Sequence, residues 1–394
     1  MAYIRKRGKT WSYTIDIGRN PATGERRQET KSGFRTKEEA KSAAARAETE
    51  VADGNFVKNT TFTFKEFSKS WLEFYEATGA VKPGSVTVRK GRINKLNSYF
   101  GEARLRDISR MDYQNMLIDL KKKYSDETII STHATAKMIF RRALELELLK
   151  SDPTKYSKVP RKQKTVEEIE NGSSLPKYME KEELAKFLNA CKAFGIDKDY
   201  HVFMILAYTG IRIGELLALK WKDINFEEHT LSVTKTYQNN RNNVREFGLV
   251  PPKTAAGIRV IEFDKTIKLV LESQRSLLNK TKMKYRNKWY EGDFVFPNMR
   301  GRYPGYPDVQ KGPEERMKKI LEAANMKSDL TPHSLRHTHT TLLAEAGAAL
   351  PEIMERLGHK DDKTTREIYL HVTKEMKKGA ADKFSKLMSK VVTM

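Results

Sequence analysis

Residues 150–177, "KSDPTKYSKVPRKQKTVEEIENGSSLPK", contain three prolines and show neither helical nor strand periodicity. Proline removes a backbone donor and disfavours helix in the residue before it, so this composition is typical of an extended linker. A chain of 394 residues is also too long for one ordinary hydrophobic core. We therefore predict separate folding units joined by a linker over 161–176.

The charge of the chain indicates the kind of partner that it binds. With 74 Lys and Arg against 51 Asp and Glu, the formal net charge is +23 and the pI is about 9.7. This excess of one sign favours a polyanionic partner, either nucleic acid or an acidic membrane surface. Solubility alone rarely requires so much charge.

No segment of the sequence suggests insertion into a membrane. The basic start, "MAYIRKRGKTW", is not followed by an apolar stretch, and the longest apolar run, "VFMILAY" at 202–208, is too short to span a bilayer. The single cysteine, Cys191, cannot form an internal disulfide, which fits a reducing cytosol, and we expect it to be a small buried side chain. We expect a cytoplasmic protein without a membrane partner.

Residues 1–59 are predicted to form a small module of three strands and one helix. Polar and apolar residues alternate over 3–17, which is typical of a hairpin, and 25–32 favours a third strand. The helix is expected to begin after Thr36, with Glu39 completing a capping box. The module has 13 Lys and Arg against 8 Asp and Glu. An exposed basic face for phosphate contact is one interpretation, and lysines that only protect a sheet edge are the other.

Residues 60–160 are predicted to form a bundle of about four short helices. Phe64, Phe67, Trp71 and Phe74 recur at helical spacing and are expected in its core. The segment that follows, "KPGSVTVRKGRINKLNSYFG" at 82–101, carries several basic residues among its apolar positions. A basic helical bundle often grips DNA, although bundles also serve many other functions.

Residues 177–394 are predicted to form the largest domain, rich in helices but with strand-like stretches such as "TLSVTKTYQ" and "GIRVIEF". The segment 250–263, "VPPKTAAGIRVIEF", is interpreted as a tight hairpin with Lys253 at its mouth. The fold class is thus mostly α and multidomain. It combines a small N-terminal three-stranded sheet plus helix, a helical bundle, and an α-rich mixed domain with a small β-sheet.

The stretch "TPHSLRHTHTTLLAEAG", 331–347, predicts an amphipathic helix over about 332–346. One face carries His333, Arg336, His337 and Thr340 through i, i+3, i+4 and i+7 spacing. The two histidines have the spacing of metal ligands, but the arginine between them would repel a cation, so we expect no metal. An arginine flanked by neutral histidines suits an oxyanion, and phosphate above all. His339 faces the other way and is expected to be a hydrogen-bonded core histidine.

Other segments offer partners for such an anion. "AYTGIRIGELLALKW", 207–221, places Arg212 at a glycine-flanked turn into a helix, where Glu215 can hold its guanidinium. A surface salt bridge is the alternative. "LPEIMERLGHKD", 350–361, presents His359 just past a helix end, and Tyr369 lies in the next predicted helix. A lone tyrosine of this kind is by default a half-buried aromatic whose hydroxyl has a partner.

Taken together, these fragments resemble the tyrosine recombinase (phage integrase) family. The resemblance rests on T-G-I-R-I-G-E at 209–215, H-S-L-R at 333–336, L-G-H at 357–359 and Tyr369, in one order and at one set of intervals. It spans about 177–390. Less specifically, the first 160 residues are similar to the arm-type DNA-binding module and helical core-binding domain of integrases of temperate phages and conjugative transposons.

The resemblance implies a catalytic set and a mechanism. Tyr369 would attack the scissile phosphate to give a 3′-phosphotyrosyl link, and recombination would pass through a Holliday junction. Arg212 and Arg336 would clamp the non-bridging oxygens, with Glu215 orienting the first arginine. His333 would accept the tyrosine proton, His359 would bond a phosphate oxygen, and Lys253 would protonate the leaving oxygen. The phosphotyrosine retains the bond energy, so no cofactor or metal is expected.

The resemblance also implies a domain order and partners. It gives an arm-type DNA-binding module over 1–59, a core-binding (SAM-like) domain over 60–160, a linker over 161–176 and a catalytic domain with a C-terminal packing helix over 177–394. Expected partners are double-stranded DNA at core and arm-type sites, three further copies of the chain in a tetramer, and DNA-bending or excision factors. When bound to DNA, the protein would be associated with the nucleoid. Candidate DNA contacts are Arg5, Lys6, Arg7, Lys9, Lys82, Arg89, Lys90, Arg92, Arg161, Lys162 and Lys164.

Several alternatives remain open. A Xer-like resolvase or a type IB topoisomerase would use the same pocket, although a minimal resolvase lacks the basic N-terminal module. A non-catalytic DNA-binding regulator would not need Tyr369. A metal-dependent strand transferase would need a divalent ion.

Overall fold

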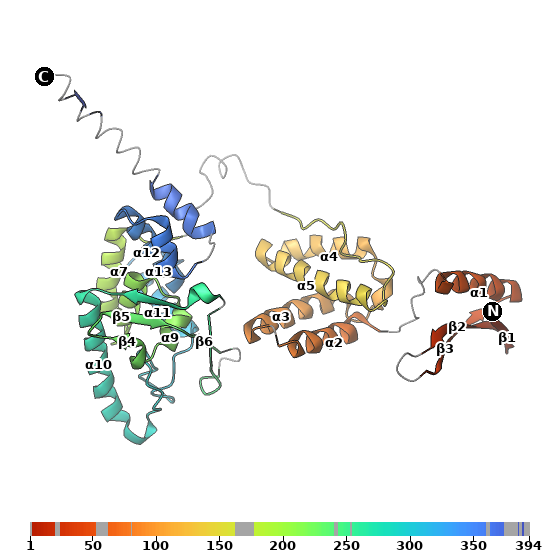
Figure 1. The fold of residues 1–394 in the computed structure, drawn as a ribbon, viewed down its shortest axis with the longest axis horizontal. Coiled ribbons are helices and arrows are strands. Elements are labelled where there is room, and N and C mark those ends of the chain that lie inside the picture. Colours follow the sequence, from red (N-terminus) through yellow and green to blue (C-terminus); the bar gives the residue numbers. More distant parts are fainter. Residues whose placement is uncertain are drawn as a thin grey trace. The chain divides into compact units, whose positions relative to one another are not determined.

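The computed structural model describes residues 2–19, 24–52, 62–79, 81–161, 177–239, 243–252, 254–359, 363–373, 385 and 388–389. The chain divides into two compact units, Met1–Gln163 and Lys164–Met394 (Figure 1). The predicted fold class is confirmed: helices dominate, with a small three-stranded sheet near the N-terminus and small sheets in the second unit.

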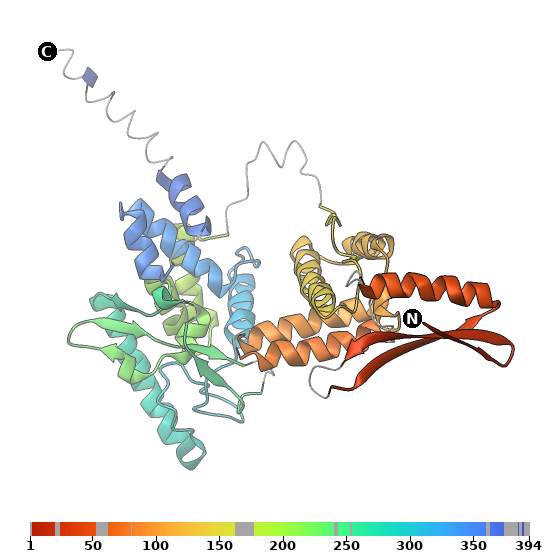
Figure 2. The ribbon, with the colours of Figure 1, turned by 45° about the vertical axis from the view of Figure 1, so that its right-hand side comes forward.

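The first unit begins with an antiparallel sheet covered by one helix. Strands β1 (Tyr3–Arg7), β2 (Thr10–Arg19) and β3 (Arg26–Phe34) pair in sequence order, and α1 (Lys37–Ala52) lies along one face (Figure 2). Tyr13 and Ile15 pack against the alanines of α1, whose small side chains allow close approach. The predicted cap is present, because Thr36 Oγ1 accepts from Glu39 N at 3.1 Å.

A four-helix bundle follows: α2 (Phe64–Ala77), α3 (Pro83–Phe100), α4 (Arg110–Lys123) and α5 (Asp126–Glu145). Phe64, Phe67 and Trp71 lie in its core as predicted. Phe74 does not: it is 48% exposed, and the Arg142 guanidinium lies over its ring at 4.5 Å. The error arose because helical spacing permits either i+3 or i+4 after Trp71, and α2 turns Tyr75 rather than Phe74 toward the core, where Tyr75 stacks on Trp71.

The second unit is a helical domain with two small sheets. Its helices are α7 (Lys181–Phe194), α8 (Asp199–Thr209), α9 (Ile213–Ala218), α10 (Lys265–Tyr285), α11 (Lys311–Ala323), α12 (Pro332–Glu345) and α13 (Leu350–Leu357), and a further helix covers 363–373. Strands β4 (Ile224–Asn225), β5 (Thr230–Val233) and β8 (Arg259–Glu262) form one antiparallel sheet, and β6 (Thr236–Gln238) pairs with β7 (Gly248–Val250). Leu231 and Ile261, which are register partners, lie in one core with the helices.

The predicted hairpin over 250–263 is wrong. Strand β7 pairs with β6, whereas β8 pairs with β5, so the two strands belong to different sheets. A short 3-10 turn at Ala255–Gly257 carries the chain from one to the other. The prediction of a tight hairpin failed because a strand's pairing partner can lie far away in the sequence.

Four charged side chains hold the N-terminal end of α8, of which Lys198 and Asp199 are buried and Asp308 and Arg316 are partly buried. Lys198 donates to Asp308 Oδ2 and to the Pro297 carbonyl, at 3.0 and 2.7 Å. Arg316 bridges Asp199 and Asp308, at 2.7 and 3.0 Å. Burial alone would raise the pKa of Asp308, but Lys198 and Arg316 keep it below its usual value. This cluster ties α8, α11 and the loop before α11 together.

Cys191 is buried as predicted, and burial raises the pKa of its thiol to about 12. Among the residues that the structure describes, no helix is both long enough and apolar enough to cross a membrane.

His339 joins three helices of the second unit, as a core histidine should. Its Nδ1 bonds the Ala207 carbonyl of α8 at 2.9 Å, and its Nε2 accepts from Arg356 Nε of α13 at 3.2 Å. A guanidinium only donates, so the neutral ring must carry its proton on Nδ1. Burial and the Arg356 charge lower the pKa of His339 to about 3.

The stability of the second unit should therefore depend on His339 in acid. A histidine whose pKa is lowered on folding stabilises fully above its unfolded-state pKa of about 6.5, and this contribution is lost as the pH falls. The variant His339→Asn keeps an N–H near Ala207 but does not titrate. Its deficit in unfolding free energy against the wild type should shrink by up to about 1.4 kcal/mol per pH unit below pH 6.5. Calorimetry of both proteins between pH 7 and pH 4 measures this; a constant deficit would contradict it.

Candidate active site

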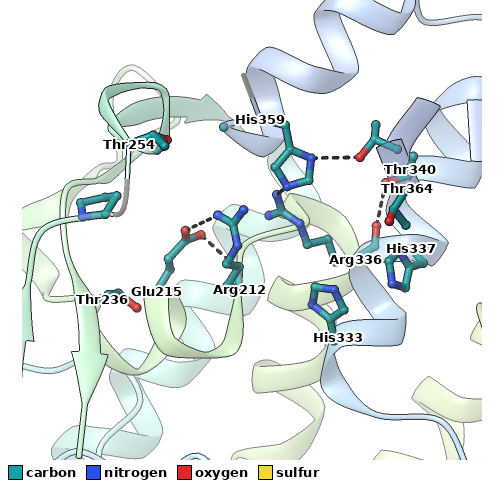
Figure 3. Close-up of a pocket in the computed structure, with 14 residues that line it drawn as sticks. Arg212, Glu215, Thr236, Thr254, His333, Arg336, His337, Thr340, His359 and Thr364 are labelled. Carbon is teal, nitrogen blue, oxygen red and sulfur yellow. Dashed lines mark hydrogen bonds and ion pairs between the residues drawn. The ribbon is translucent and has the colours of Figure 1, made fainter. Parts of the chain in front are cut away.

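A cavity of about 740 Å³ opens in the second unit, between α9, α12, the end of α13 and the segment after β7 (Figure 3). Its lining comes from five separate stretches of the chain and is rich in cationic and hydroxyl side chains. The lining residues are Arg212, Glu215, Thr236, Pro252, Thr254, Gly257, His333, Arg336, His337, Thr340, Gly358, His359, Thr364 and Thr365.

One side of the cavity is the polar face of α12. Thr331 is the residue before the helix and Pro332 its first residue, so the helix begins where the sequence predicted. All four residues of the predicted face, His333, Arg336, His337 and Thr340, line the cavity. The ring centroids of His333 and His337 lie 4.7 Å apart, and the two rings meet edge to face. The regular spacing of one helix thus aligns an arginine with two imidazoles.

Arg336 is only 2% exposed and is held by backbone carbonyls. Its Nη1 donates to the Gly210 carbonyl and its Nη2 to the Leu357 carbonyl, each at 2.6 Å. Gly210 has φ of +64° and ends α8, and Leu357 ends α13. Helix C-termini leave carbonyls without intrahelical donors and favour nearby positive charge. One guanidinium therefore joins two helix ends at the edge of the cavity.

Arg212 faces the same cavity from another helix. It is the residue before α9, and its side chain is 39% exposed. Glu215 binds it twice: Oε1 accepts from Arg212 Nη1 at 2.9 Å and Oε2 from Arg212 N at 3.0 Å. In Figure 3 the two guanidinium groups of Arg212 and Arg336 come from different helices toward one space.

Glu215 has a second arginine partner that sequence reasoning missed. Arg259 Nη2 donates to Glu215 Oε2 at 2.9 Å, and both side chains are 5% exposed or less. Burial alone would raise the pKa of Glu215, but bonds and charges of Arg259 and Arg212 lower it below its usual value. The available signal was strand alternation: in β8, Arg259 and Ile261 point inward while Val260 is 62% exposed.

His359 follows directly after α13. Gly358, with φ of +70°, ends that helix and turns the chain, as the Leu-Gly-His pattern predicted. His359 Nε2 accepts from Arg336 Nη2, so its Nδ1 carries the proton and donates to Thr365 Oγ1 at 2.9 Å. The imidazole is thereby oriented from both sides.

One predicted site residue does not line the cavity, and another lies outside the described residues. Tyr369 does not line it; the half-buried ring packs beside an apolar cluster that includes Ile353, Leu357 and Ile368. Lys253 lies outside the described residues, although its neighbours Pro252 and Thr254 line the cavity.

The candidate DNA contacts differ in their surroundings. Arg5, Lys6, Arg7 and Lys9 are exposed on β1 and the turn after it, and Lys90 and Arg161 are exposed as well, while Lys82 is half-buried. Arg89 and Arg92 instead donate to Thr135 and Ser131 of α5, at 2.8 and 3.3 Å, and so link helices inside the bundle. Lys162 and Lys164 lie outside the described residues.

Chemically, the cavity is suited to an oxyanion. Two arginines and several imidazoles provide N–H donors for a tetrahedral anion, and hydroxyls surround them. Within the described part of the chain, no group of three or more His, Cys, Asp or Glu side chains is arranged to hold a metal ion.

Comparison with known proteins assigns the family. Residues 177–376 match the phage integrase family, 3–51 match an arm DNA-binding domain, and 63–121 match the N-terminal SAM-like domain of phage integrases. The first match covers about half of the chain. The chain belongs to the phage integrase family.

Relatives and solved structures to which the chain is similar agree with this assignment. The integrase of Staphylococcus phage L54a is 28% identical over 338 residues, covering 83% of this chain and 94% of the relative. The ICEBs1 integrase of Bacillus subtilis (strain 168) is 27% identical over 401 residues, covering 97% and 99%. The Tn1549 transposon integrase, solved with transposon right end DNA, shares the fold with a TM-score of 0.64 at 20% identity, covering 82% and 100%. The chain is thus a tyrosine recombinase of the integrase type.

The turn at Gly358 gives a test of the site's packing. A Cβ there would lie 2.7 Å from the Ala256 carbonyl oxygen and 3.1 Å from two Arg259 atoms, and the φ is positive. Gly347 also has a positive φ, +88°, but open space around it. Gly347→Ala should cost about 1–2 kcal/mol of stability from backbone strain alone, whereas Gly358→Ala should cost about 1–3 kcal/mol more, from overpacking. Equal losses in chemical denaturation would show that the contact is absent.

Proposed function

We propose that this chain integrates and excises a mobile element by cutting and rejoining double-stranded DNA through a 3′-phosphotyrosyl intermediate. The observation that carries the proposal is the convergence of Arg212, Arg336 and His359 on one cavity from positions almost 150 residues apart. The net charge of +23 favours a nucleic-acid partner. The similarity to the integrase of Staphylococcus phage L54a and to the ICEBs1 integrase supports a mobile-element origin.

In this mechanism the arginines stabilise the charge that develops on the scissile phosphate. Arg212 and Arg336 each contact a non-bridging oxygen, and each contributes about 3 kcal/mol in the transition state. Glu215 and the two helix-end carbonyls already fix these guanidinium groups, so little reorganisation is required. His359 bonds a phosphate oxygen as well. Its Nε2 must then become the donor, because in the DNA-free site it accepts from Arg336.

Tyr369 is the nucleophile, and it must move before it can react. Its helix, over 363–373, is held beside the cavity by Ile368 and Val372 in a small apolar cluster. His333 accepts the phenolic proton, and Lys253 protonates the leaving 5′-oxygen. Because the phosphotyrosine conserves the energy of the phosphodiester, religation needs neither nucleotide nor metal.

We further propose a division of labour along the chain. The arm-type module is 1–59, the core-binding domain is 60–160, the linker is 161–176 and the catalytic domain is 177–394. Four copies act together on two DNA duplexes with bending or excision factors, in the cytoplasm and at the nucleoid. The exposed basic residues of β1 support an arm-type role for the first module.

Trapping a covalent adduct on a nicked duplex tests the chemistry. The nick lets the short 5′-hydroxyl product escape, so the phosphotyrosyl link accumulates. Tyr369→Phe should lower the adduct yield by about 1000-fold or more, with DNA affinity unchanged. Tyr208→Phe is the matched control, because that tyrosine is exposed and does not line the cavity, and it should react like the wild type. EDTA should have no effect. A regulator would give no adduct with any of these proteins, and a metal-dependent transferase would lose activity in EDTA.

Deleting residues 1–59 separates an integrase from a resolvase. The truncated protein should still form the adduct on a core-site duplex, because the cavity lies wholly in the second unit. Recombination between plasmids that carry the ends of the element and its target should fall by at least about 100-fold, through loss of the multivalent arm contact. Undiminished recombination would indicate that the protein is a Xer-like resolvase instead.

A further inference from the structure

Arg259, at the start of β8, is a buried cation that the reaction described above does not use. Its side chain is 5% exposed and donates to three acceptors. Nη2 bonds Glu215 Oε2 at 2.9 Å, Nη1 bonds the Gly257 carbonyl at 3.1 Å, and Nε bonds the Arg356 carbonyl at 2.7 Å. Each nitrogen of the guanidinium therefore has a fixed partner.

The three acceptors belong to three different parts of the cavity. Glu215 carries Arg212, Gly257 belongs to the turn that follows Pro252 and Thr254, and Arg356 lies in the last turn of α13. The side chain also touches the residue before His359, because a Cβ on Gly358 would lie 3.1 Å from Arg259 Cδ and Nη1. Arg259 thus contacts the supports of Arg212 and of His359 at the same time.

The bonds at Glu215 show how Arg259 would act on Arg212. Oε2 accepts from both Arg259 Nη2 and Arg212 N, which fixes the rotation of the carboxylate. Oε1 is then directed at Arg212 Nη1. Without Arg259, the buried Glu215 carboxylate would have Arg212 as its one arginine partner. The carbonyls of Gly257 and Arg356 would also lose the donor that Arg259 gives them, and leaving buried acceptors unsatisfied destabilises the fold.

We propose that Arg259 is a positioning residue that sets the orientation of Arg212 through Glu215 and supports the backbone that presents His359. The inference rests on the proposed function, in which Arg212 contacts a non-bridging oxygen of the scissile phosphate. It concerns a residue that never touches DNA itself.

The test compares cleavage of an ordinary scissile phosphate with cleavage of a neutral one. In a methylphosphonate one non-bridging oxygen is a methyl group, so the arginine that faces that oxygen has no charge to stabilise. Arg259→Gln should form the adduct on the ordinary nicked duplex about 100-fold more slowly than the wild type, the cost of a misplaced catalytic group. On one of the two methylphosphonate stereoisomers, its deficit should fall to about threefold or less. DNA affinity, measured by gel shift, should stay within about twofold.

Arg356→Gln is the control for a structural role. Arg356 is also a partly buried arginine that bonds carbonyls, those of Tyr208 and Glu262, but its side chain bonds neither Glu215 nor the Gly257 turn. If Arg356→Gln lowers the rate of adduct formation, it should lower it by the same factor on the ordinary duplex and on both methylphosphonate isomers.

Arg259→Lys decides the matter if Arg259→Gln shows no cooperative thermal transition. An ammonium keeps the charge beside Glu215 but cannot match the planar fork that serves three acceptors. Its deficit should be about tenfold on the phosphate and should again fall on one methylphosphonate isomer. A deficit that is equal on the phosphate and both isomers, or wild-type rates throughout, would overturn the inference. Failure of the wild type to form any adduct would overturn the proposed function instead.

Discussion

The candidate site depends on one buried carboxylate shared by two arginines. Glu215 binds Arg212, which reaches the cavity, and Arg259, which reaches the structures around it. A buried ion pair costs desolvation and contributes little net stability, but it is strongly directional when every oxygen is used. Here both oxygens are used. The fold therefore fixes the orientation of the Arg212 guanidinium at the cavity, and such preorganised charge is what electrostatic catalysis requires.

Carbonyl groups at helix ends hold the other arginine side chains of the site in place. Arg336 bonds the last carbonyls of α8 and α13, and Arg259 bonds another carbonyl of α13. Carbonyls at helix C-termini attract cations and cannot rotate away as side chains can. The site is thus assembled on rigid backbone positions, while the tyrosine sits on a separate helix held by apolar contacts. The two arginines and Tyr369 are thus positioned in different ways within one domain, the arginines by backbone carbonyls and a carboxylate, the tyrosine by apolar packing of its helix.

The sequence predicted the parts of the site that lie within single elements. The polar face of α12 follows from helical spacing, and Gly210 and Gly358 mark the ends of α8 and α13. Relations between elements could not be predicted. The 250–263 hairpin was wrong because β7 and β8 pair with strands outside that segment. The alternation within β8 could have indicated that Arg259 points inward, but not that it meets Glu215, 44 positions away in the sequence. Phe74 shows the same limit, since helical spacing alone does not say whether Phe74 or Tyr75 faces the bundle core.

The four charges at the start of α8 have a consequence for how this sequence can change over time. Lys198, Asp199, Asp308 and Arg316 form one closed set of two cations and two anions, so losing any single member leaves the remaining, largely buried charges unbalanced. Such a loss costs about 3–5 kcal/mol, whereas replacing a whole set by apolar residues is often neutral. Any single substitution on the way from the charged set to an apolar set is therefore destabilising. Lineages descending from this protein should keep all four residues together or exchange them together, even though none of them approaches the cavity.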